Sequence, residues 1–232
     1  MKLAYDLHIH SVLSPCADRL MTPHNIFNMA MLKELDMIAI TDHNALFQAP
    51  IYHEIQESYD FLFLYGAEIT VSEGFHVLVY FEKVKEALLL QEVIHSYLVD
   101  YPAKFPENQT ICNVLDDEIA SYPYDLYHVL KLSFHELSKK VHALGGLVIL
   151  AHVDRNHFGI IHKNVSLLKE DIDAIEVKDL ANLPIVLEEY PILQDFKILH
   201  NSDAHTLENM HEADYTIECD DKTFASFKKA LS

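Results

Sequence analysis

Two histidines lie one residue apart at the end of an apolar stretch near the start of the chain. The segment reads Ala4-Tyr5-Asp6-Leu7-His8-Ile9-His10. Successive side chains of a β-strand point to opposite faces, so His8 and His10 project to the same side. Two neutral imidazoles on one face are half of a metal site. We therefore interpret this pair as metal ligands.

Further histidines and carboxylates follow short β-branched or aliphatic stretches elsewhere in the chain. One metal needs three or four protein ligands, so a set this large indicates two or three divalent ions (Zn, Mn or Fe) in a shared cleft. A glutamate buried after an aliphatic strand is costly unless a cation compensates its charge, so we expect Glu68 to bridge two ions. The candidate ligands are His8, His10, Asp18, His43, Glu68, His76, His152, Asp203 and His205.

Strand and helix patterns alternate along the chain. Thr22 and Pro23 begin a helix with 3.6-residue periodicity, and Ser133 with Glu136 forms a capping box for a helix that reaches about Leu144. Repeated strand-then-helix order indicates parallel βαβ units and an α/β barrel, with its site at the carboxyl ends of the strands. We expect strands at 3–9, 36–40, 61–65, 75–81, 147–150, 173–177 and 197–199.

Residues 82–132 do not fit this alternation. A helix is expected over 82–98, followed by a proline-punctuated stretch in which 109–114 and 119–122 are able to form a hairpin. We interpret the segment as an insertion, either a surface excursion or a lid over the barrel mouth. No linker divides the chain, so residues 1–232 are expected to form a single domain.

Charge and composition limit the partners and the location. The net charge is −19, from 17 Lys and Arg against 36 Asp and Glu. Because nucleic-acid phosphates need a basic footprint, we expect no stable nucleic-acid binding. No apolar stretch approaches the roughly 18–20 residues of a membrane helix, and the first residues do not resemble a secretory signal. Three scattered cysteines suit a reducing compartment. We therefore expect a soluble cytoplasmic protein without a membrane partner.

The whole set of motifs resembles the polymerase and histidinol phosphatase (PHP) family of metal-dependent phosphoesterases. The resemblance spans about residues 3–210 and implies a distorted (β/α)7 TIM-like barrel, the PHP fold, with a trinuclear metal centre at its C-terminal mouth. The matching segments are Asp6-Leu7-His8-Ile9-His10-Ser11, Ile40-Thr41-Asp42-His43, Gly66-Ala67-Glu68-Ile69, His76-Val77-Leu78, Ala151-His152 and Ser202-Asp203-Ala204-His205.

The resemblance also implies how the ligands divide among three metals: His8, His10, Glu68 and Asp203 for one, Glu68, His76 and His152 for a second, and Asp18, His43 and His205 for a third. The chain departs from the family pattern at the third metal, where it reads Ser14-Pro15-Cys16-Ala17-Asp18-Arg19. Asp18 is the expected ligand from its distance to the helix start. Cys16 is the alternative, either a soft ligand that favours zinc or a thiol that merely lies nearby.

The chemistry expected from such a cluster is phosphate-ester hydrolysis. Metals about 3.5–4 Å apart bridge a water, lower its pKa and hold phosphoryl oxygens. Glu68, His43 and Arg155 are expected to carry catalysis, with Arg155 and Arg19 binding the phosphate unless each forms an ordinary salt bridge instead. Asp42 is expected to orient a ligand histidine.

The main interpretation of function is hydrolysis of a small phosphomonoester, such as a nucleotide or sugar phosphate. An exonuclease or oligonucleotide phosphodiesterase is the alternative, because the same centre is able to cleave diesters. A non-catalytic metal-binding regulatory module is the third interpretation.

Overall fold

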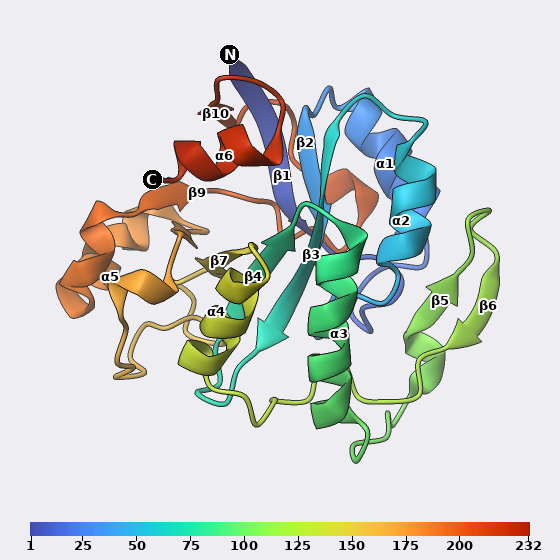
Figure 1. The fold of residues 1–232 in the computed structure, drawn as a ribbon, viewed down its shortest axis with the longest axis horizontal. Helices are drawn as coiled ribbons and strands as arrows, with labels where there is room; N and C mark the ends of the chain where they lie inside the picture. Colours follow the sequence, from blue (N-terminus) through green and yellow to red (C-terminus); the bar gives the residue numbers. More distant parts are fainter.

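The strands form one curved mixed sheet and a separate hairpin (Figure 1). The structure, a computed structural model, describes residues 1–232. Its strands are β1 (Lys2–Ile9), β2 (Met37–Ile40), β3 (Leu62–Thr70), β4 (His76–Phe81), β5 (Thr110–Cys112), β6 (Glu118–Ser121), β7 (Leu147–Leu150), β8 (Ala174–Glu176), β9 (Lys197–Leu199) and β10 (Thr216–Glu218). Eight of them form the sheet in the order β10-β1-β2-β3-β4-β7-β8-β9, while β5 and β6 pair only with each other.

Six α-helices surround this sheet. They are α1 (Pro23–Leu32), α2 (Ala49–Gln56), α3 (Val84–Leu98), α4 (Phe134–Ala143), α5 (Leu183–Glu189) and α6 (Phe224–Ala230), with short 3₁₀ turns at Pro106–Asn108, Lys169–Asp171, Leu180–Asn182, Pro191–Asp195 and Leu207–Asn209. α1 packs on α2 and α2 on α3, and α3 also contacts β3 and β4. None of these helices has the length and apolar character needed to span a membrane.

The strand directions bring all the polar strand ends to one edge of the sheet. β1, β2 and β3 run parallel, β4 is antiparallel to both β3 and β7, and β8 and β9 follow β7 in parallel. The reversed β4 therefore begins at the edge where its neighbours end, and this places His76, its first residue, beside them. Beyond the strand ends, the amide of His10 donates to the carbonyl of Ala204 at 2.9 Å, which draws the ends of β1 and β9 together.

Side-chain alternation along the strands sorts the core into two clusters, one of 51 and one of 18 buried residues. The smaller cluster gathers residues from all eight strands of the sheet and is covered by Phe227 of α6, so it fills the concave side. On β3, Leu64 belongs to this inner cluster, and Phe63 and Tyr65 belong to the outer one. Glu68 shares the parity of Leu64 and therefore points into the concavity.

The fold belongs to the expected α/β class, but it does not follow the regular (β/α)7 repeat that was expected. The sheet is a curled, mixed half-barrel, and the strict (β/α)7 order is absent because β4 and β10 run against their neighbours. Within 82–132, helix α3 buries residues such as Leu90 and Ile94, so it is part of the wall of the domain. The β5–β6 hairpin lies at one side of the molecule (Figure 1), where Cys112 belongs to the larger buried cluster and its amide donates to Oε1 of Gln48 at 2.9 Å. The capping box of Ser133 and Glu136 is present at the start of α4.

Candidate metal centre

The carboxylate of Glu68 lies at the centre of five imidazole rings. Its side chain is 1% exposed. It comes from the inward face of β3, and the rings come from the ends of β1, β2 and β7 and the start of β4. The nearest ring nitrogens belong to His76 at 2.7 Å, His152 at 2.9 Å, His43 at 3.0 Å, and His8 and His10 at 3.4 Å each.

The contacts of His8 and His10 fit a cation held between them. The Nε2 atoms of the two rings are 3.2 Å apart. Nδ1 of His8 faces the carboxylate of Glu176 at 3.0 and 3.1 Å, so Nδ1 carries the proton of the neutral ring. Nδ1 of His10 lies 3.0 Å from Oγ of Ser14, whose own hydroxyl donates to Asp42 at 2.6 Å. Both Nε2 lone pairs therefore face one another, an arrangement that a bound cation stabilises.

Asp42 acts on the cluster through Ser14. Its buried carboxylate accepts hydrogen bonds from the Ser11 amide at 2.8 Å, from the Ser11 hydroxyl at 2.7 Å and from the Tyr52 hydroxyl at 3.1 Å, in addition to the Ser14 hydroxyl. Ser14 is therefore left to accept from His10. The role expected for Asp42, orientation of a histidine, is consistent with this chain of contacts.

Glu176 is a part of the site that the sequence reasoning missed. It is fully buried at the end of β8, and it accepts hydrogen bonds from the His152 amide at 2.8 Å and from the Asn201 side chain at 2.8 Å, besides facing His8. A carboxylate behind a histidine ligand fixes the ring orientation and raises its basicity. The available signal was the same one that identified Glu68, an acidic residue at the end of an aliphatic strand.

Replacing Glu176 with Gln is expected to weaken metal binding by about 10- to 100-fold, because His8 loses its charged partner while the shape of the side chain is kept. Competition titration against a chromophoric chelator measures this affinity. The exposed Glu170→Gln variant is the matched control and should bind metal as the unmodified chain does. Equal affinity in both variants would show that Glu176 is only a packing residue.

Two of the candidate ligands have strained backbones. His152 has φ of 27° and Asp203 has φ of 52°, both in the left-handed region that non-glycine residues rarely adopt. Such strain concentrates at functional sites, where the surroundings hold it. Asp203 also pairs with Arg155, whose Nη1 lies 2.7 Å from its carboxylate and whose side chain is 41% exposed. The guanidinium therefore lies at the edge of the cluster, open to an arriving anion.

The cluster opens into a cavity of about 390 Å³. Eight of the expected ligands gather in or beneath it: His8, His10, His43, Glu68, His76, His152, Asp203 and His205. Nδ1 of His152 is buried without a hydrogen-bond partner, and Nδ1 of His43 faces the Glu68 carboxylate at 3.0 Å without hydrogen-bond geometry. The full cavity lining is Cys16, His43, Glu68, Thr70, His76, Tyr127, His152, Arg155, His157, Phe158, Asp203 and His205.

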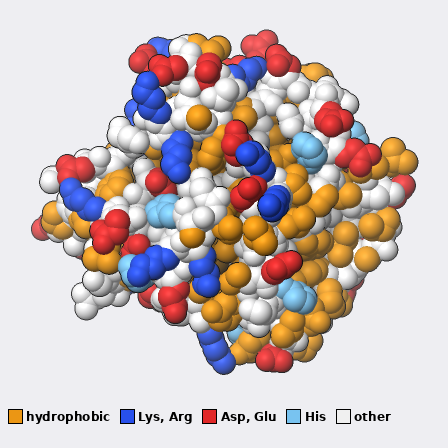
Figure 2. Space-filling model, viewed as in Figure 1, with side chains coloured by type: hydrophobic (Ala, Val, Ile, Leu, Met, Phe, Trp, Pro, Cys, Tyr) orange, Lys and Arg blue, Asp and Glu red, His pale blue; other side chains and the backbone are white.

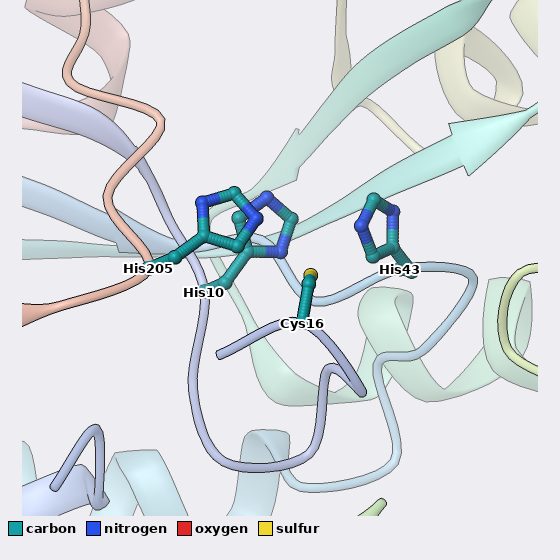
Figure 3. A group of neighbouring side chains, drawn as sticks. All are labelled: His10, Cys16, His43 and His205. Atoms are coloured by element: carbon teal, nitrogen blue, oxygen red, sulfur yellow. The ribbon is translucent and has the colours of Figure 1, made fainter. Parts of the chain in front are cut away.

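The structure does not bring Asp18 and Arg19 to this cavity. The carboxylate of Asp18 is exposed and accepts a hydrogen bond from the amide of Leu20 at 2.8 Å. Arg19 lines two other hollows, beside the β5–β6 hairpin. Cys16, in the same loop, has its sulfur facing the histidines instead (Figure 3). The loop turns the carboxylate of Asp18 outward.

Burial and charge oppose one another in the cluster. Burial alone would raise the pKa of Glu68, but His76, His8 and His43 outweigh it and hold that pKa well below its usual range. Burial would lower the pKa of His43, yet the charge of Glu68 and a hydrogen bond with Cys16 raise it to about 10. Without a bound ion, the cluster therefore contains protonated imidazoles paired with carboxylates.

Solved structures share this fold at low sequence identity. The lesion-specific endonuclease PfuEndoQ from Pyrococcus furiosus has a TM-score of 0.71 and 21% identity, with 100% of this chain and 56% of that chain covered. Endonuclease Q in complex with a 27-mer duplex containing an abasic lesion has a TM-score of 0.65 and 20% identity, with 99% and 56% covered. A candidate metal-dependent phosphoesterase from Bifidobacterium adolescentis has a TM-score of 0.60 and 17% identity, with 97% and 94% covered.

These similarities correct the expectation of a small phosphorylated substrate without stable nucleic-acid binding. The same fold occurs in an endonuclease solved with a 27-mer duplex substrate, and this chain spans about 56% of that protein's length. A net charge of −19 therefore does not exclude a nucleic-acid partner. The physical reason is that net charge averages over the whole surface, whereas bound cations are the largest local charges in a metal site.

Family membership follows from the sequence as well as from the fold. No curated protein matches the chain significantly in sequence. The PHP domain matches residues 6–179, which include every strand end of the cluster except that of β9. The resemblance drawn from the motifs is thereby confirmed, and the chain belongs to the PHP domain family, whose members are metal-dependent hydrolases that act on phosphate esters.

Proposed function

We propose that this chain hydrolyses phosphodiester bonds in short single-stranded nucleic acids. The observation that carries this proposal is the pair of half-exposed aromatic rings on the lining of the metal cavity. Tyr127 is 48% exposed and Phe158 is 47% exposed, although each ring contacts a histidine of the cluster. Such rings beside a phosphate-binding centre suit a substrate that carries both a phosphate and a flat base.

The two rings are held by the cluster itself. The Tyr127 ring centroid lies 5.0 Å from that of His43, and the Phe158 ring is stacked on His76 at 4.3 Å with an interplanar angle of 13°. Bases of single strands stack on exposed aromatic side chains, and each stack contributes about 1–3 kcal/mol. Stacking is tolerant of sequence, so these residues favour a nucleotide chain without selecting one base.

The residues of the centre divide into ion binding and phosphate binding. Divalent ions at such a centre lower the pKa of water and neutralise phosphoryl oxygens. Glu68 supplies the shared carboxylate, His43 and the other rings supply nitrogens, and Asp203 supplies a second carboxylate. Arg155 lies at the open edge, where its free nitrogens are able to donate to a phosphate oxygen.

The surface charge favours a short strand over a long duplex. On the face shown in Figure 2, Lys and Arg side chains are interspersed with Asp and Glu and form no continuous basic stripe. Long duplexes are bound mainly through many phosphate contacts from basic residues. A short strand needs few such contacts, so the centre and its aromatic rings are sufficient to hold it.

A dinucleotide assay tests the proposal. With Mn²⁺ or Zn²⁺ present, a 5′-phosphorylated dinucleotide should be cleaved with a kcat/KM at least about 10-fold above that for phosphate release from its mononucleotide, because the second base adds a stack. Tyr127→Ala and Phe158→Ala should each reduce the dinucleotide rate about 10-fold, and one of the two should leave the mononucleotide rate nearly unchanged, because a mononucleotide has only one base to stack. Preference for the mononucleotide would overturn the proposal and indicate a phosphomonoesterase.

A further inference from the structure

The loop between β1 and α1 carries a cysteine whose sulfur faces three histidines of the centre. Figure 3 shows Cys16 directed toward the rings of His10, His43 and His205. One ligand atom from each of these four residues lies within 4.8 Å of every other. The residues come from four separate segments, the ends of β1, β2 and β9 and the loop itself, so their meeting is a product of the fold and not of local sequence.

The position of Cys16 is fixed by backbone hydrogen bonds of the two residues that follow it. The amide of Ala17 donates to the carbonyl of Ser14 at 3.0 Å, and the amide of Asp18 donates to the carbonyl of His205 at 2.8 Å. The loop is therefore bound, two residues after Cys16, to the segment that carries one of the facing histidines. The outward carboxylate of Asp18 is a consequence of the same turn.

Ring contacts show which nitrogens remain for an ion beside Cys16. Nδ1 of His205 lies 2.8 Å from the carbonyl of Asp203, which only accepts, so Nε2 of the neutral ring has a free lone pair. Nδ1 of His43 is on the side of Glu68, at 3.0 Å, so its Nε2 is on the side of Cys16. Nε2 of His10 lies 3.3 Å from Asp203 and 3.2 Å from His8, so His10 belongs with those residues.

We propose that Cys16, as a thiolate, binds one divalent ion of the centre together with His43 and His205, and that this position selects zinc-like ions over Mn²⁺ and Mg²⁺. Thiolate and imidazole donors favour Zn²⁺, whereas carboxylates and water favour Mg²⁺ and Mn²⁺. Three protein donors leave a fourth tetrahedral position open, as in catalytic zinc sites. The proposal rests on the metal dependence of the proposed function and adds an ion preference to one position.

Cobalt(II) gives a readout of the thiolate ligand that does not depend on hydrolysis. The metal-stripped full chain is titrated with Co²⁺, without substrate, and the sulfur-to-cobalt charge-transfer absorption in the near ultraviolet is recorded. We expect this band in the unmodified chain and in Asp18→Asn, Cys112→Ser and Cys219→Ser, and its complete loss in Cys16→Ser. Persistence of the band in Cys16→Ser, or its absence from the unmodified chain at saturating Co²⁺, overturns the proposal.

Affinity measurements test the ion preference. In Cys16→Ser, one of the bound Zn²⁺ ions should bind at least about 100-fold more weakly, because a direct ligand is lost. This loss should exceed the one caused by removing a residue that only hydrogen-bonds to a ligand. Cys16→Asp should restore ion binding at this position without the charge-transfer band, because the new ligand is a carboxylate. The same position should then prefer Mn²⁺ more than it does in the unmodified chain. Unchanged Zn²⁺ affinity in Cys16→Ser would contradict the assignment. Cys16 is exposed, so these variants are expected to fold.

Alkylation provides an independent check on the same chain. Cys16 is exposed, whereas Cys112 and Cys219 are buried, so iodoacetamide should modify mainly Cys16 in the metal-stripped protein. Saturating Zn²⁺ should slow this modification at least about 10-fold, because a coordinated thiolate is a weaker nucleophile. An unchanged rate would show that the sulfur is not a ligand. Failure of the dinucleotide assay with the cobalt band present would refute the substrate and leave the ion site intact.

Discussion

Replacing Glu68 with Gln is expected to reduce kcat/KM by about 1,000-fold or more and to lower the metal content of the purified protein. The amide keeps the shape of the side chain and removes the negative charge on which five imidazole rings converge. Removing a single preorganised electrostatic contact typically costs about 10²–10³ in rate. Glu68 is expected to bridge two ions, so the loss should be at the upper end of that range or beyond it. Elemental analysis and steady-state kinetics measure the two effects.

The matched control is Glu92→Gln, the same chemical change at an exposed position of α3. It should retain full activity and metal content. The loss of rate and metal content in Glu68→Gln should also exceed that of any substitution at Cys16. Cys16 is proposed to bind one ion, whereas Glu68 is expected to bind the other ions of the centre. If Glu68→Gln kept its metals and lost less than about 10-fold in rate, the central role of this carboxylate would be refuted.

The convergence of most candidate ligands was predictable because the strands are regular. His8 and His10 share a strand face, and Glu68 and His152 follow short aliphatic stretches whose period and ends are visible in the sequence. Parallel strands place their carboxyl ends at one edge of the sheet. The ligands at these strand ends therefore meet there independently of the loop conformations. His76 was also found, although it begins its strand, and the antiparallel direction of β4 explains why it reaches the same edge.

The choice between Cys16 and Asp18 could not be made from the sequence. The loop that carries them has no hydrophobic period, and its shape depends on the bond from the Asp18 amide to the carbonyl of His205 at 2.8 Å, far away in the chain. Distance to the helix start favoured Asp18, and Arg19 beside it was expected to bind phosphate; both side chains turn away from the cavity. Side-chain direction in an irregular loop is a tertiary property, so spacing does not determine it.

Tyr127 is a second site residue whose position could not be predicted from the sequence. It belongs to the segment 82–132, which breaks the strand-and-helix alternation, and no pattern within that segment indicates contact with His43. The chain returns from the β5–β6 hairpin past the cavity, with the side chain of Asn44 donating to the carbonyls of Leu126 and His128 at 2.8 and 2.9 Å. Part of the insertion therefore lines the site, and a lid over the barrel mouth stays a prediction.

Removing the metals is expected to reverse how stability depends on pH. In the metal-free protein the carboxylates raise the pKa of His43 to about 10 and that of His8 well above its ordinary 6.5, although burial opposes both shifts. A folded-state pKa above the unfolded one stabilises the protein fully below about pH 6.5, and this contribution is lost as the pH rises toward 10. The lowered pKa values of Glu68 and Asp203 have the opposite effect: they stabilise the protein above about pH 4, and this contribution is lost at lower pH.

The facing His205 and His43 lower the pKa of the Cys16 thiol to about 5 although burial opposes this, so Cys16 adds stability as the pH rises toward 9 and offsets the loss from His43. The raised pKa values of His8 and His10 leave a net decline over that interval.

The metal-free protein should therefore be most stable between about pH 4.5 and 6.5 and should weaken from there to pH 9. Metal binding requires deprotonated imidazoles, so its contribution grows over the same interval. Urea unfolding with and without a chelator should show a small difference at pH 5 and a large one at pH 8. The metal-free Glu68→Gln variant should lose much of the decline above pH 6.5, because the charge that raises the pKa of His43 is gone. A metal-free protein that gains stability between pH 6.5 and 9 would contradict the paired imidazolium and carboxylate arrangement on which the whole centre is built.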